Sequence, residues 1–571
     1  MTINPSGWRP AAPSDVHGNA PATTTGNRAL MLEEALLFEI GSVDQTGVDF
    51  DTFSPSRQSG RGRATEGGEG EGMSSSNGDK PSPGSLREPS PPAPAGGAKL
   101  GGLLRAPIDL PGLSEPETVR HYTRLSRQNY AIDLGLFPLG SCTMKHNPRL
   151  NEKMARLPGF ADIHPLQPQE TVQGALELID TLAHWLIELT GMNGVAMSPK
   201  AGAHGELCGI LSIRAALEAR GDARSVVLVP ESAHGTNPAT AAFAGYKVED
   251  IPATAAGRVD LDALKARLGP DVAAVMITNP NTCGLFEPQM KEISDAVHAA
   301  GGFVYCDGAN FNAIVGRVRP GDLGIDAMHI NLHKTFSTPH GGGGPGSGPV
   351  VLSAALAAFA PLPFVARGEG GKYHLVEEES AGAQQPESFG RMVAFHGQMG
   401  MFTRALSYIL SHGADGLRQV AEDAVLNANY LLRSLEDVLD APFAFSGPCM
   451  HEAIFSDKGF ADGFSTIDVA KGLIDEGFHP MTMYFPLVVH GAMLIEPTET
   501  ESKASLDQFI TALRSIAERA RAGDEALKAA PIFAPRRRLD ETLAARKPVL
   551  AWKTPAPDGA DSGEGAELGG R

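Results

Sequence analysis

The chain has 571 residues, 42% of them hydrophobic, which is long enough for roughly two or three domains with a sizeable core. A formal net charge of -19 argues against nucleic acid as a partner. The five cysteines are odd in number and widely scattered, unlike a disulfide framework or a zinc site, and no window approaches the roughly 18 apolar residues of a membrane helix.

The N-terminal segment, residues 1–112, is predicted to be largely disordered. Within it, residues 42–100 form a low-complexity insert rich in glycine, serine and proline, which cannot bury enough apolar surface to fold alone. Residues 553–571 have the same character. The first residues lack both a secretory apolar region and an arginine-rich amphipathic pattern, so we expect a cytoplasmic protein without membrane association.

Ordered structure is expected from residue 113. Residues 115–125 read as a helix that opens with acidic side chains at its positive end. They are followed by the unusual turn GSCTMKHNP, residues 140–148. The turn is either a plain surface loop or a functional segment, and it either reaches a neighbouring chain or folds back on its own domain. Cys142 within it is expected to pack as a small buried residue.

A second helix is predicted over residues 170–189, where leucine and isoleucine recur at intervals of three and four. The sequence SPKAGAHGE, residues 198–206, then leads into a helical run over 207–219. Small residues before a helix leave backbone N–H groups free to bind an anion. Ala201, Gly202 and Ala203 are therefore candidates for such a site, although the motif alone is weak.

The middle of the chain alternates short apolar strands with helices. Strands are expected at 225–230, 272–278 and 303–306, and helices at 261–268 and 290–300. Continuous apolar strands of this kind are typical of a parallel sheet covered on both faces. Polar residues follow the strands, and open α/β sheets bind ligands at that edge. These residues are His234, Asn279, Asn281, Asp307 and Lys334.

Lys334 lies in NLHKTFSTPHGGGGPG, residues 331–346, directly after an apolar run. The glycines remove side chains opposite the lysine, as close approach of a planar or anionic group requires. An aspartate at a strand end (Asp307), then another strand, then His-Lys is an order typical of enzymes that use pyridoxal 5′-phosphate (PLP). In such enzymes the lysine forms a Schiff base and the carboxylate keeps the pyridine nitrogen protonated.

Beyond residue 387 the pattern changes to long helices with short strands. Helices are expected at 391–410, 414–438, 467–475 and 506–521, and strands at 443–445 and 450–455. We interpret residues 113–386 as a large cofactor-binding domain and residues 387–552 as a smaller α+β domain.

Several motifs together resemble a known family. They are SEPE at 114–117, residues 140–148, AGAHGE at 201–206, HGTNPA at 234–239, DGAN at 307–310, residues 331–346, GFHP at 477–480 and EPTETE at 496–501. The chain resembles the P-proteins of the glycine cleavage system, glycine dehydrogenase (decarboxylating), and within them the separate second, PLP-bearing chain. The resemblance runs from about residue 113 to 552.

The resemblance implies an α/β, fold type I PLP-dependent transferase with Lys334 as the catalytic residue. Asp307 would bind the pyridine nitrogen, His234 would stack on the ring, and Ala201, Gly202 and Ala203 would hold the phosphate. Either Asn279 or Asn281 would reach the ring hydroxyl. His333 would contact the phosphate or simply pack beside Lys334. No metal is expected.

The implied reaction is decarboxylation of glycine, with transfer of the aminomethyl group to the lipoyl group of the small H-protein. The implied partner is a homologous first subunit in a heterotetramer of two dimers. One alternative is another fold type I enzyme: an aminotransferase, a cysteine desulfurase or an amino-acid decarboxylase. A second is a non-catalytic subunit that keeps the fold, against which the intact set of Lys334, Asp307 and His234 argues.

Overall fold

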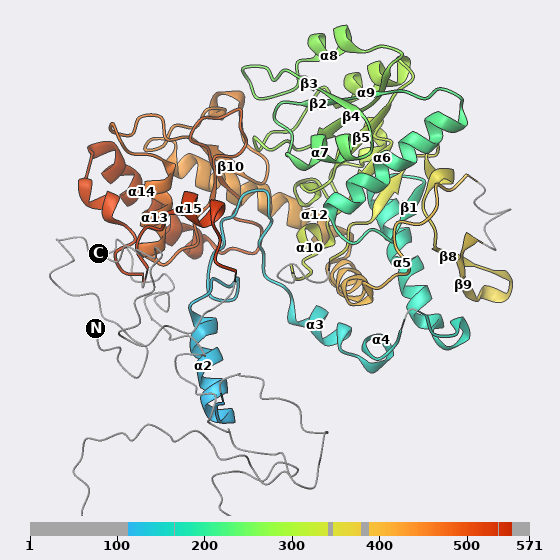
Figure 1. Cartoon of the computed structure of the whole chain (residues 1–571), viewed down its shortest axis with the longest axis horizontal. Coiled ribbons are helices and arrows are strands. Elements are labelled where there is room, and N and C mark those ends of the chain that lie inside the picture. The colour runs from blue at the N-terminus through green and yellow to red at the C-terminus, as the bar shows by residue number, and fades with distance from the viewer. Residues whose placement is uncertain (1–111, 165, 341–345, 379–386, 535, 551–571) are drawn as a thin grey trace, which may run out of the picture. The chain divides into compact units, whose positions relative to one another are not determined.

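The computed structural model describes residues 112–164, 166–340, 346–378, 387–534 and 536–550 (Figure 1). The predicted insert at 42–100, the tail at 553–571 and the glycines at 341–344 lie outside these residues. Residues 130–538 belong to one compact unit. Because the sheet region and the C-terminal helices share that unit, the predicted domain boundary at residue 386 stays a prediction.

A second unit includes helices α2 (Glu115–Arg127) and α15 (Glu541–Arg546). The expected helix at 115–125 is therefore present. It begins in a capping box, because the Ser114 amide donates to the Glu117 carboxylate at 3.0 Å while the Ser114 hydroxyl accepts from the Glu117 amide at 3.4 Å.

The centre of the larger unit is a seven-stranded sheet in the order β1-β7-β6-β5-β4-β2-β3 (Figure 1). Strands β2 to β6 pair in parallel, whereas β7 runs antiparallel to both of its neighbours. The strands are β1 (Gly194–Ala196), β2 (Val226–Pro230), β3 (Lys247–Ile251), β4 (Val272–Thr278), β5 (Phe303–Asp307), β6 (Ala327–His329) and β7 (Val350–Leu352). The expected parallel sheet is thus present, with one antiparallel strand that the sequence did not predict.

Both faces of this sheet are buried because neighbouring residues of each strand point to opposite sides. On one face Leu228 and Val304 pack with residues of α5 (Gln173–Thr190), α9 (Met290–Ala299) and the long helix α12 (Met399–Leu435). On the other face the adjacent residues Val227 and Tyr305 pack with residues of α6 (Gly202–Ala219) and α7 (Thr236–Phe243). The sheet is therefore covered on both faces, as the apolar strands predict.

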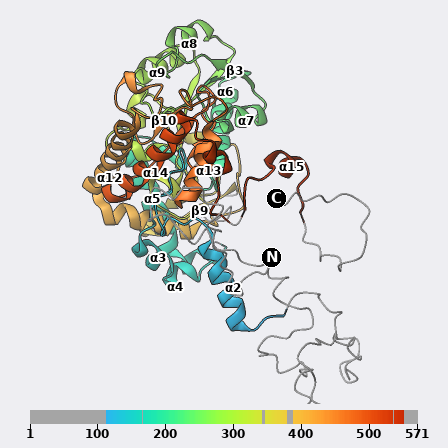
Figure 2. The same cartoon turned by 90° about the vertical axis from the view of Figure 1, so that its left-hand side faces the viewer.

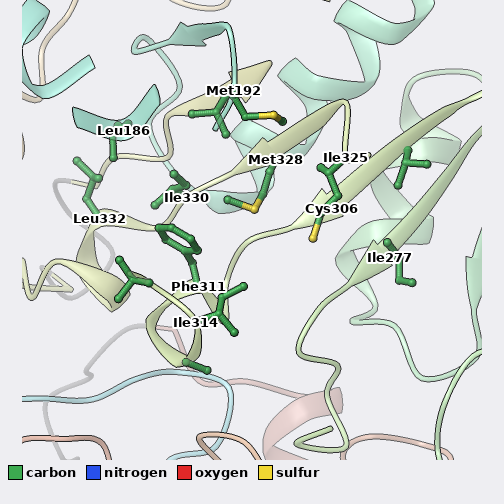
Figure 3. Close-up of a cluster of buried hydrophobic side chains, with 14 of the residues drawn as sticks. Leu186, Met192, Ile277, Cys306, Phe311, Ile314, Ile325, Met328, Ile330 and Leu332 are labelled. Atoms are coloured by element: carbon green, nitrogen blue, oxygen red, sulfur yellow. The ribbon is translucent and has the colours of Figure 1, made fainter. Parts of the chain in front are cut away.

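The first of these two cores reaches the segment that carries Lys334. Figure 3 shows Ile330 and Leu332 in the same cluster as Phe311, Met328 and Leu186. Ile330 and Leu332 are both fully buried. Because Leu332 opens the one-turn helix α10 (Leu332–Thr335), its burial fixes where that turn lies and therefore the base of the Lys334 side chain.

A smaller antiparallel sheet, ordered β10-β12-β11, packs with the C-terminal helices. Its strands are β10 (Ala453–Phe455), β11 (Thr482–Met483) and β12 (Met493–Ile495). Helices α13 (Thr466–Glu476) and α14 (Lys503–Ala522) share one core with it, and they appear in orange and red in Figures 1 and 2. The predicted small α+β arrangement is present in this part of the chain.

The remaining described elements connect these layers. The α-helices are α3 (Arg149–Ala155), α4 (Pro158–Ala161) and α8 (Leu261–Arg267), and β8 (Phe364–Arg367) pairs with β9 (Tyr373–Val376). The 3-10 turns are Gln169–Thr171, Phe311–Ala313, Pro320–Leu323, Ala357–Phe359, Glu369–Gly371, Ala444–Ser446 and Glu525–Ala529.

Two local predictions in the C-terminal part are wrong. The helix expected at 391–410 starts only at Met399, whereas the predicted break before 414–438 is present, because α12 is interrupted at Gly413, where φ is 63°. The strand expected at 443–445 is instead a 3-10 turn, Ala444–Ser446. The side chain of Phe445 in this turn is 73% exposed, so it does not contribute to a buried strand.

None of the described helices combines the length and the apolar character needed to cross a bilayer. All five cysteines are free thiols.

Candidate active site

The carboxyl ends of the parallel strands meet at one edge of the large sheet, and a cavity of about 250 Å³ opens there. Asp307 ends β5, Thr278 ends β4 and His329 ends β6. His234 and Lys334 join them from the loops that follow β2 and β6. Of the five polar residues that the sequence predicted at this edge, His234, Asp307 and Lys334 line the cavity, whereas Asn279 and Asn281 do not.

Lys334 lies on the single helical turn α10, with its side chain half-buried. Its amino group donates to the backbone carbonyl of Ser141 at 2.7 Å. Ser141 also lines the cavity. The turn at residues 140–148, which the sequence left open as a plain loop or a functional segment, is therefore part of the site and lies against its own chain.

Asp307 is held rigidly beneath the cavity. Its Oδ1 accepts from the Ala309 amide at 2.9 Å and lies 3.4 Å from His329 Nε2. The Asn237 amide group, oriented to satisfy both neighbours, donates to Asp307 Oδ2 and to Glu206 at 3.1 Å each. A carboxylate fixed by three neighbours keeps one orientation toward the cavity, as a partner for a ring nitrogen must.

His329 and Tyr305 extend this network away from the cavity. His329 Nδ1 lies 2.6 Å from the Tyr305 hydroxyl, and both side chains are buried. Burial lowers the pKa of His329, so the ring is neutral at neutral pH. Asp307 therefore faces a neutral imidazole, which leaves its negative charge available to a ligand.

Glu206 is a second buried acid in the cavity wall, and sequence reasoning did not single it out. Its carboxylate accepts from the hydroxyls of Thr236 at 2.8 Å and Thr240 at 3.1 Å. Burial, followed by repulsion from Asp307, raises its pKa to about 7. Glu206 is the last residue of the motif AGAHGE, which could have marked it as a candidate, but nothing in the sequence shows that its carboxyl faces Asp307.

Glu206 makes the cofactor-free chain sensitive to pH. The pKa of this carboxyl is 4.5 in the unfolded chain and about 7 in the folded chain, so the folded chain binds the proton more tightly. The resulting stabilisation is fully present below pH 4.5 and is lost as the pH rises through 7. Glutamine does not titrate, so Glu206→Gln should gain stability relative to wild type by about 3 kcal/mol between pH 4.5 and 8. Urea unfolding at the two pH values measures this difference. An identical pH dependence in both proteins would contradict the shift.

Ala201, Gly202 and Ala203 lie at the start of α6 and line the cavity. Gly202 fits tightly, because a Cβ there would lie 2.8 Å from Asn331 Nδ2 and 3.1 Å from His329 Nε2. The 18-residue helix begins at this point, and its N-cap residue Ala201 offers no side-chain hydrogen bond to the first amides. The geometry suits a phosphate group.

His234 stands at the mouth of the cavity. Its Nδ1 accepts from the Thr236 amide at 3.2 Å, which fixes the ring. The ring packs edge-on against Phe485, with 5.4 Å between the ring centroids. An oriented aromatic ring at this position suits stacking on a planar ligand.

His333 also lines the cavity, and burial lowers its pKa to about 3, with further lowering by His340 and Lys334. Its Nε2 lies 3.3 Å from Asn331 Nδ2. The ring is therefore neutral and contributes hydrogen-bonding capacity but no charge.

Asn281 does not belong to the residues that line this cavity. Its Nδ2 donates to the Gly257 carbonyl at 2.8 Å, and its Oδ1 accepts from the amides of Cys283 and Leu285 at 3.0 and 3.1 Å. Two of these bonds hold its own loop, and the third ties that loop to the segment of Gly257. The amides that do line the cavity are Asn310 and Asn331, which the sequence reasoning did not choose.

The cavity offers buried polar atoms to a ligand. Among the described residues, the Thr278 hydroxyl and the side-chain oxygens of Asn310 and Asn331 are buried without a hydrogen-bond partner. Unpaired buried polar atoms are costly unless a ligand or water satisfies them. Together with the lysine, the fixed aspartate and the helix start, they fit the aldehyde, ring nitrogen and phosphate of PLP.

Comparison with known proteins decides the family. A protein of Caulobacter vibrioides named probable glycine dehydrogenase (decarboxylating) subunit 2 is 63% identical over 551 residues, covering 95% of this chain and 97% of that protein. The chain belongs to the glycine dehydrogenase (decarboxylating) subunit 2 family. The Caulobacter alignment extends into residues 1–112, beyond the stretch where the motifs predicted the resemblance.

Other likenesses agree with the family assignment. Family models described as "Glycine dehydrogenase, C-terminal domain" and "Aminotransferase class-V" match residues 420–531 and 210–361. A Caldanaerobacter subterraneus protein named probable glycine dehydrogenase (decarboxylating) subunit 2 is 53% identical over 452 residues, covering 79% of this chain and 91% of that one.

The fold has a counterpart among solved structures. The crystal structure of a glycine decarboxylase (P-protein) of the glycine cleavage system, in inhibitor-bound form, aligns with a TM-score of 0.60. The identity is 24%, and the alignment covers 73% of this chain and 94% of that one. The predicted α/β fold class, a fold type I transferase, is confirmed. The match to the class-V aminotransferase model agrees with the predicted PLP cofactor.

Proposed function

We propose that this member of the glycine dehydrogenase subunit 2 family decarboxylates glycine with PLP bound to Lys334. It then passes the aminomethyl group to the lipoyl group of the H-protein of the glycine cleavage system. The observation that carries the proposal is the meeting of Lys334 and Asp307 in one cavity of a chain that is 63% identical to a named relative. When bound, PLP supplies an electron-accepting ring that stabilises the negative charge left by departing CO2.

The chain's own residues have separable tasks in this reaction. Lys334 would hold the cofactor covalently through its amine. The carboxylate of Asp307 would hold a proton on the ring nitrogen, and the amides at Ala201, Gly202 and Ala203 would bind the phosphate. His234 would pack on the ring. His333 would support the phosphate side of the site as a neutral hydrogen-bonding group.

Exchange of labelled CO2 into the carboxyl group of glycine tests the proposal. We expect the purified chain with PLP and its partner subunit to catalyse exchange that depends on lipoylated H-protein. The unlipoylated H-protein is the matched control and should give only background exchange. Exchange that is absent under all these conditions, or an amino transfer from glycine to a keto acid, would contradict the proposed reaction.

A cysteine desulfurase reading is disfavoured by the cysteines. Such an enzyme needs a reactive thiolate. Burial raises the pKa of every cysteine thiol in this chain, including Cys142 beside the cavity residue Ser141, where Lys334 offsets the effect only in part. The thiols are therefore protonated at neutral pH.

A cytoplasmic location is also part of this proposal. The five cysteines are all free thiols, which is compatible with that location.

The partner is proposed to be a homologous first subunit, in a heterotetramer of two dimers, because the relatives are named as subunit 2. We expect the chain alone to be poorly active and to co-purify with a partner of similar fold. Size-exclusion chromatography with light scattering, combined with the exchange assay, measures both properties. A fully active monomer would rule the partner out.

A further inference from the structure

Two glutamates of the small sheet have no task in the proposed reaction. Glu452 directly precedes β10 and Glu496 directly follows β12, and these strands pair with Ala453 opposite Ile495. The two side chains are therefore neighbours, and both are 0% exposed. Burying two acids side by side is unfavourable unless their carboxyl groups are hydrogen-bonded.

Both carboxyl groups bind the same short loop. Glu452 Oε2 accepts from the Ser141 amide at 2.8 Å and from the Ser141 hydroxyl at 3.2 Å. Glu496 Oε2 accepts from the Thr143 amide at 3.1 Å, and its Oε1 accepts from the Thr143 hydroxyl at 2.6 Å. Each glutamate thus holds one residue of the loop by both its backbone and its side chain.

The loop has a backbone that needs such support. Ser141 has φ of 61° and Thr143 has φ of 45°, in the left-handed region that residues other than glycine rarely adopt. Thr143 is β-branched, which makes this conformation less favourable still. Gly140 before them donates its amide to the Leu494 carbonyl at 3.3 Å, and a Cβ there would lie 2.4 Å from Leu494 Cγ. The conformation is therefore set by contacts with the small sheet.

The loop in turn holds the cofactor lysine. The Ser141 carbonyl accepts from the amino group of Lys334 at 2.7 Å. In the proposed function Lys334 would be the residue that holds the cofactor covalently, so its amine would be free whenever it is not bonded to the cofactor. Its free amine then needs a fixed acceptor within reach of the cavity.

We propose that Glu452 and Glu496 are positioning residues for Lys334. They hold Ser141 and Thr143 in the conformation that aims the Ser141 carbonyl at the amine. The inference rests on the proposed role of Lys334 as the cofactor lysine. The small sheet thus acts on Lys334 through the loop, by holding the acceptor of its amine in place. Neither glutamate touches the reacting atoms.

The charges near the pair allow this arrangement. Burial raises the pKa of both carboxyls, which also repel each other, and Lys334 offsets part of the shift. His451 adds no positive charge, because burial and Lys334 lower its pKa to about 3. Raised pKa values mean that the site favours a neutral carboxyl group. Glutamine is neutral and of similar shape, so the glutamine variants are suitable for the test.

The test measures how fast the full-length, cofactor-free chain captures PLP on Lys334. Samples are reduced with borohydride at intervals, and the pyridoxyl group on Lys334 is counted by mass spectrometry. We expect Glu452→Ala and Glu496→Ala to slow capture by about tenfold, because a displaced Ser141 carbonyl no longer holds the Lys334 amine by its hydrogen bond. Glu452→Gln and Glu496→Gln keep one acceptor oxygen, and they should slow capture less but measurably.

A second measurement separates positioning from loss of structure. Pyridoxamine 5′-phosphate has no aldehyde and cannot bond to the lysine, so its equilibrium affinity reports only whether the rest of the site is intact. We expect that affinity to change by less than about twofold in the glutamine variants. Glu287→Gln is the matched control, because Glu287 is also buried with a raised pKa but binds the amides of Val259 and Gln289 instead of the loop.

Two results overturn the inference. One is capture at the wild-type rate in the glutamine variants. The other is an equal loss of capture rate and of pyridoxamine 5′-phosphate affinity, which indicates a purely structural role. Failure of the wild-type chain to capture PLP on Lys334 is a different outcome, because it removes the proposed function itself.

Discussion

Replacing Lys334 with alanine is expected to reduce glycine–CO2 exchange to the background of the assay while the fold is retained. The reason is that the lysine would supply the amine for the covalent bond to the cofactor, and the described residues that line the cavity include no second lysine. Its side chain is half-buried and contributes one hydrogen bond, to Ser141, so its loss should not unfold the chain. Exchange and circular dichroism, measured on the same preparation, check both parts.

Lys200 provides a matched control for this variant. It directly precedes Ala201, the first residue of the proposed phosphate site, and burial lowers its pKa to about 8. Its amino group donates to the Phe395 carbonyl at 2.9 Å, and Lys200 does not line the cavity. Lys200→Ala should therefore keep measurable exchange. If Lys334→Ala exchanges at a rate comparable to wild type, the assignment of the cofactor lysine is wrong.

Asp307→Asn should keep PLP bound but lose most of the rate. An amide cannot stabilise a positive charge on the ring nitrogen, so the electron-accepting character of the ring weakens. A charge-assisted hydrogen bond is worth roughly 1.5–3 kcal/mol, which corresponds to a loss of at least about tenfold. Visible absorbance of bound cofactor and the exchange rate together measure retention and activity.

The control for this variant is Asp326→Asn. Asp326 is likewise buried and bound to a histidine, but it lies at the start of β6, at the opposite edge of the sheet, and accepts from the Val304 amide at 2.8 Å. Its substitution should affect stability more than the catalytic rate. Near-normal activity of Asp307→Asn would mean that Asp307 is an ordinary strand-end residue.

The strands that could be predicted are those with a continuous apolar run. β2, β4 and β5 lie within a residue of their expected bounds because each is buried on both faces. The sequence did not reveal β3, whose residues Lys247–Ile251 are mostly polar at the edge of the sheet. Nor did it reveal β1 and β7, which have three residues each and too short a pattern to be distinguished from loop.

The site could be predicted where one residue type carries the chemistry. Lys334, Asp307 and His234 were identified because they follow strands, and parallel strands bring their ends together. Ser141 was not identified, because its contact with Lys334 joins residues 193 positions apart and uses a backbone atom. Asn281 was chosen by its strand-end position, yet its amide is used to fold its own loop.

The central claim is that Lys334 carries the cofactor, and one measurement tests it most directly. The wild-type chain is loaded with PLP, reduced with borohydride, digested and mapped by mass spectrometry. We predict a single pyridoxyl group, on Lys334, whose recovery falls when glycine is added before reduction. A pyridoxyl group on another lysine would contradict the account, for example on the half-buried Lys200 or on the buried Lys145, which is ion-paired with Glu499 at 2.7 Å.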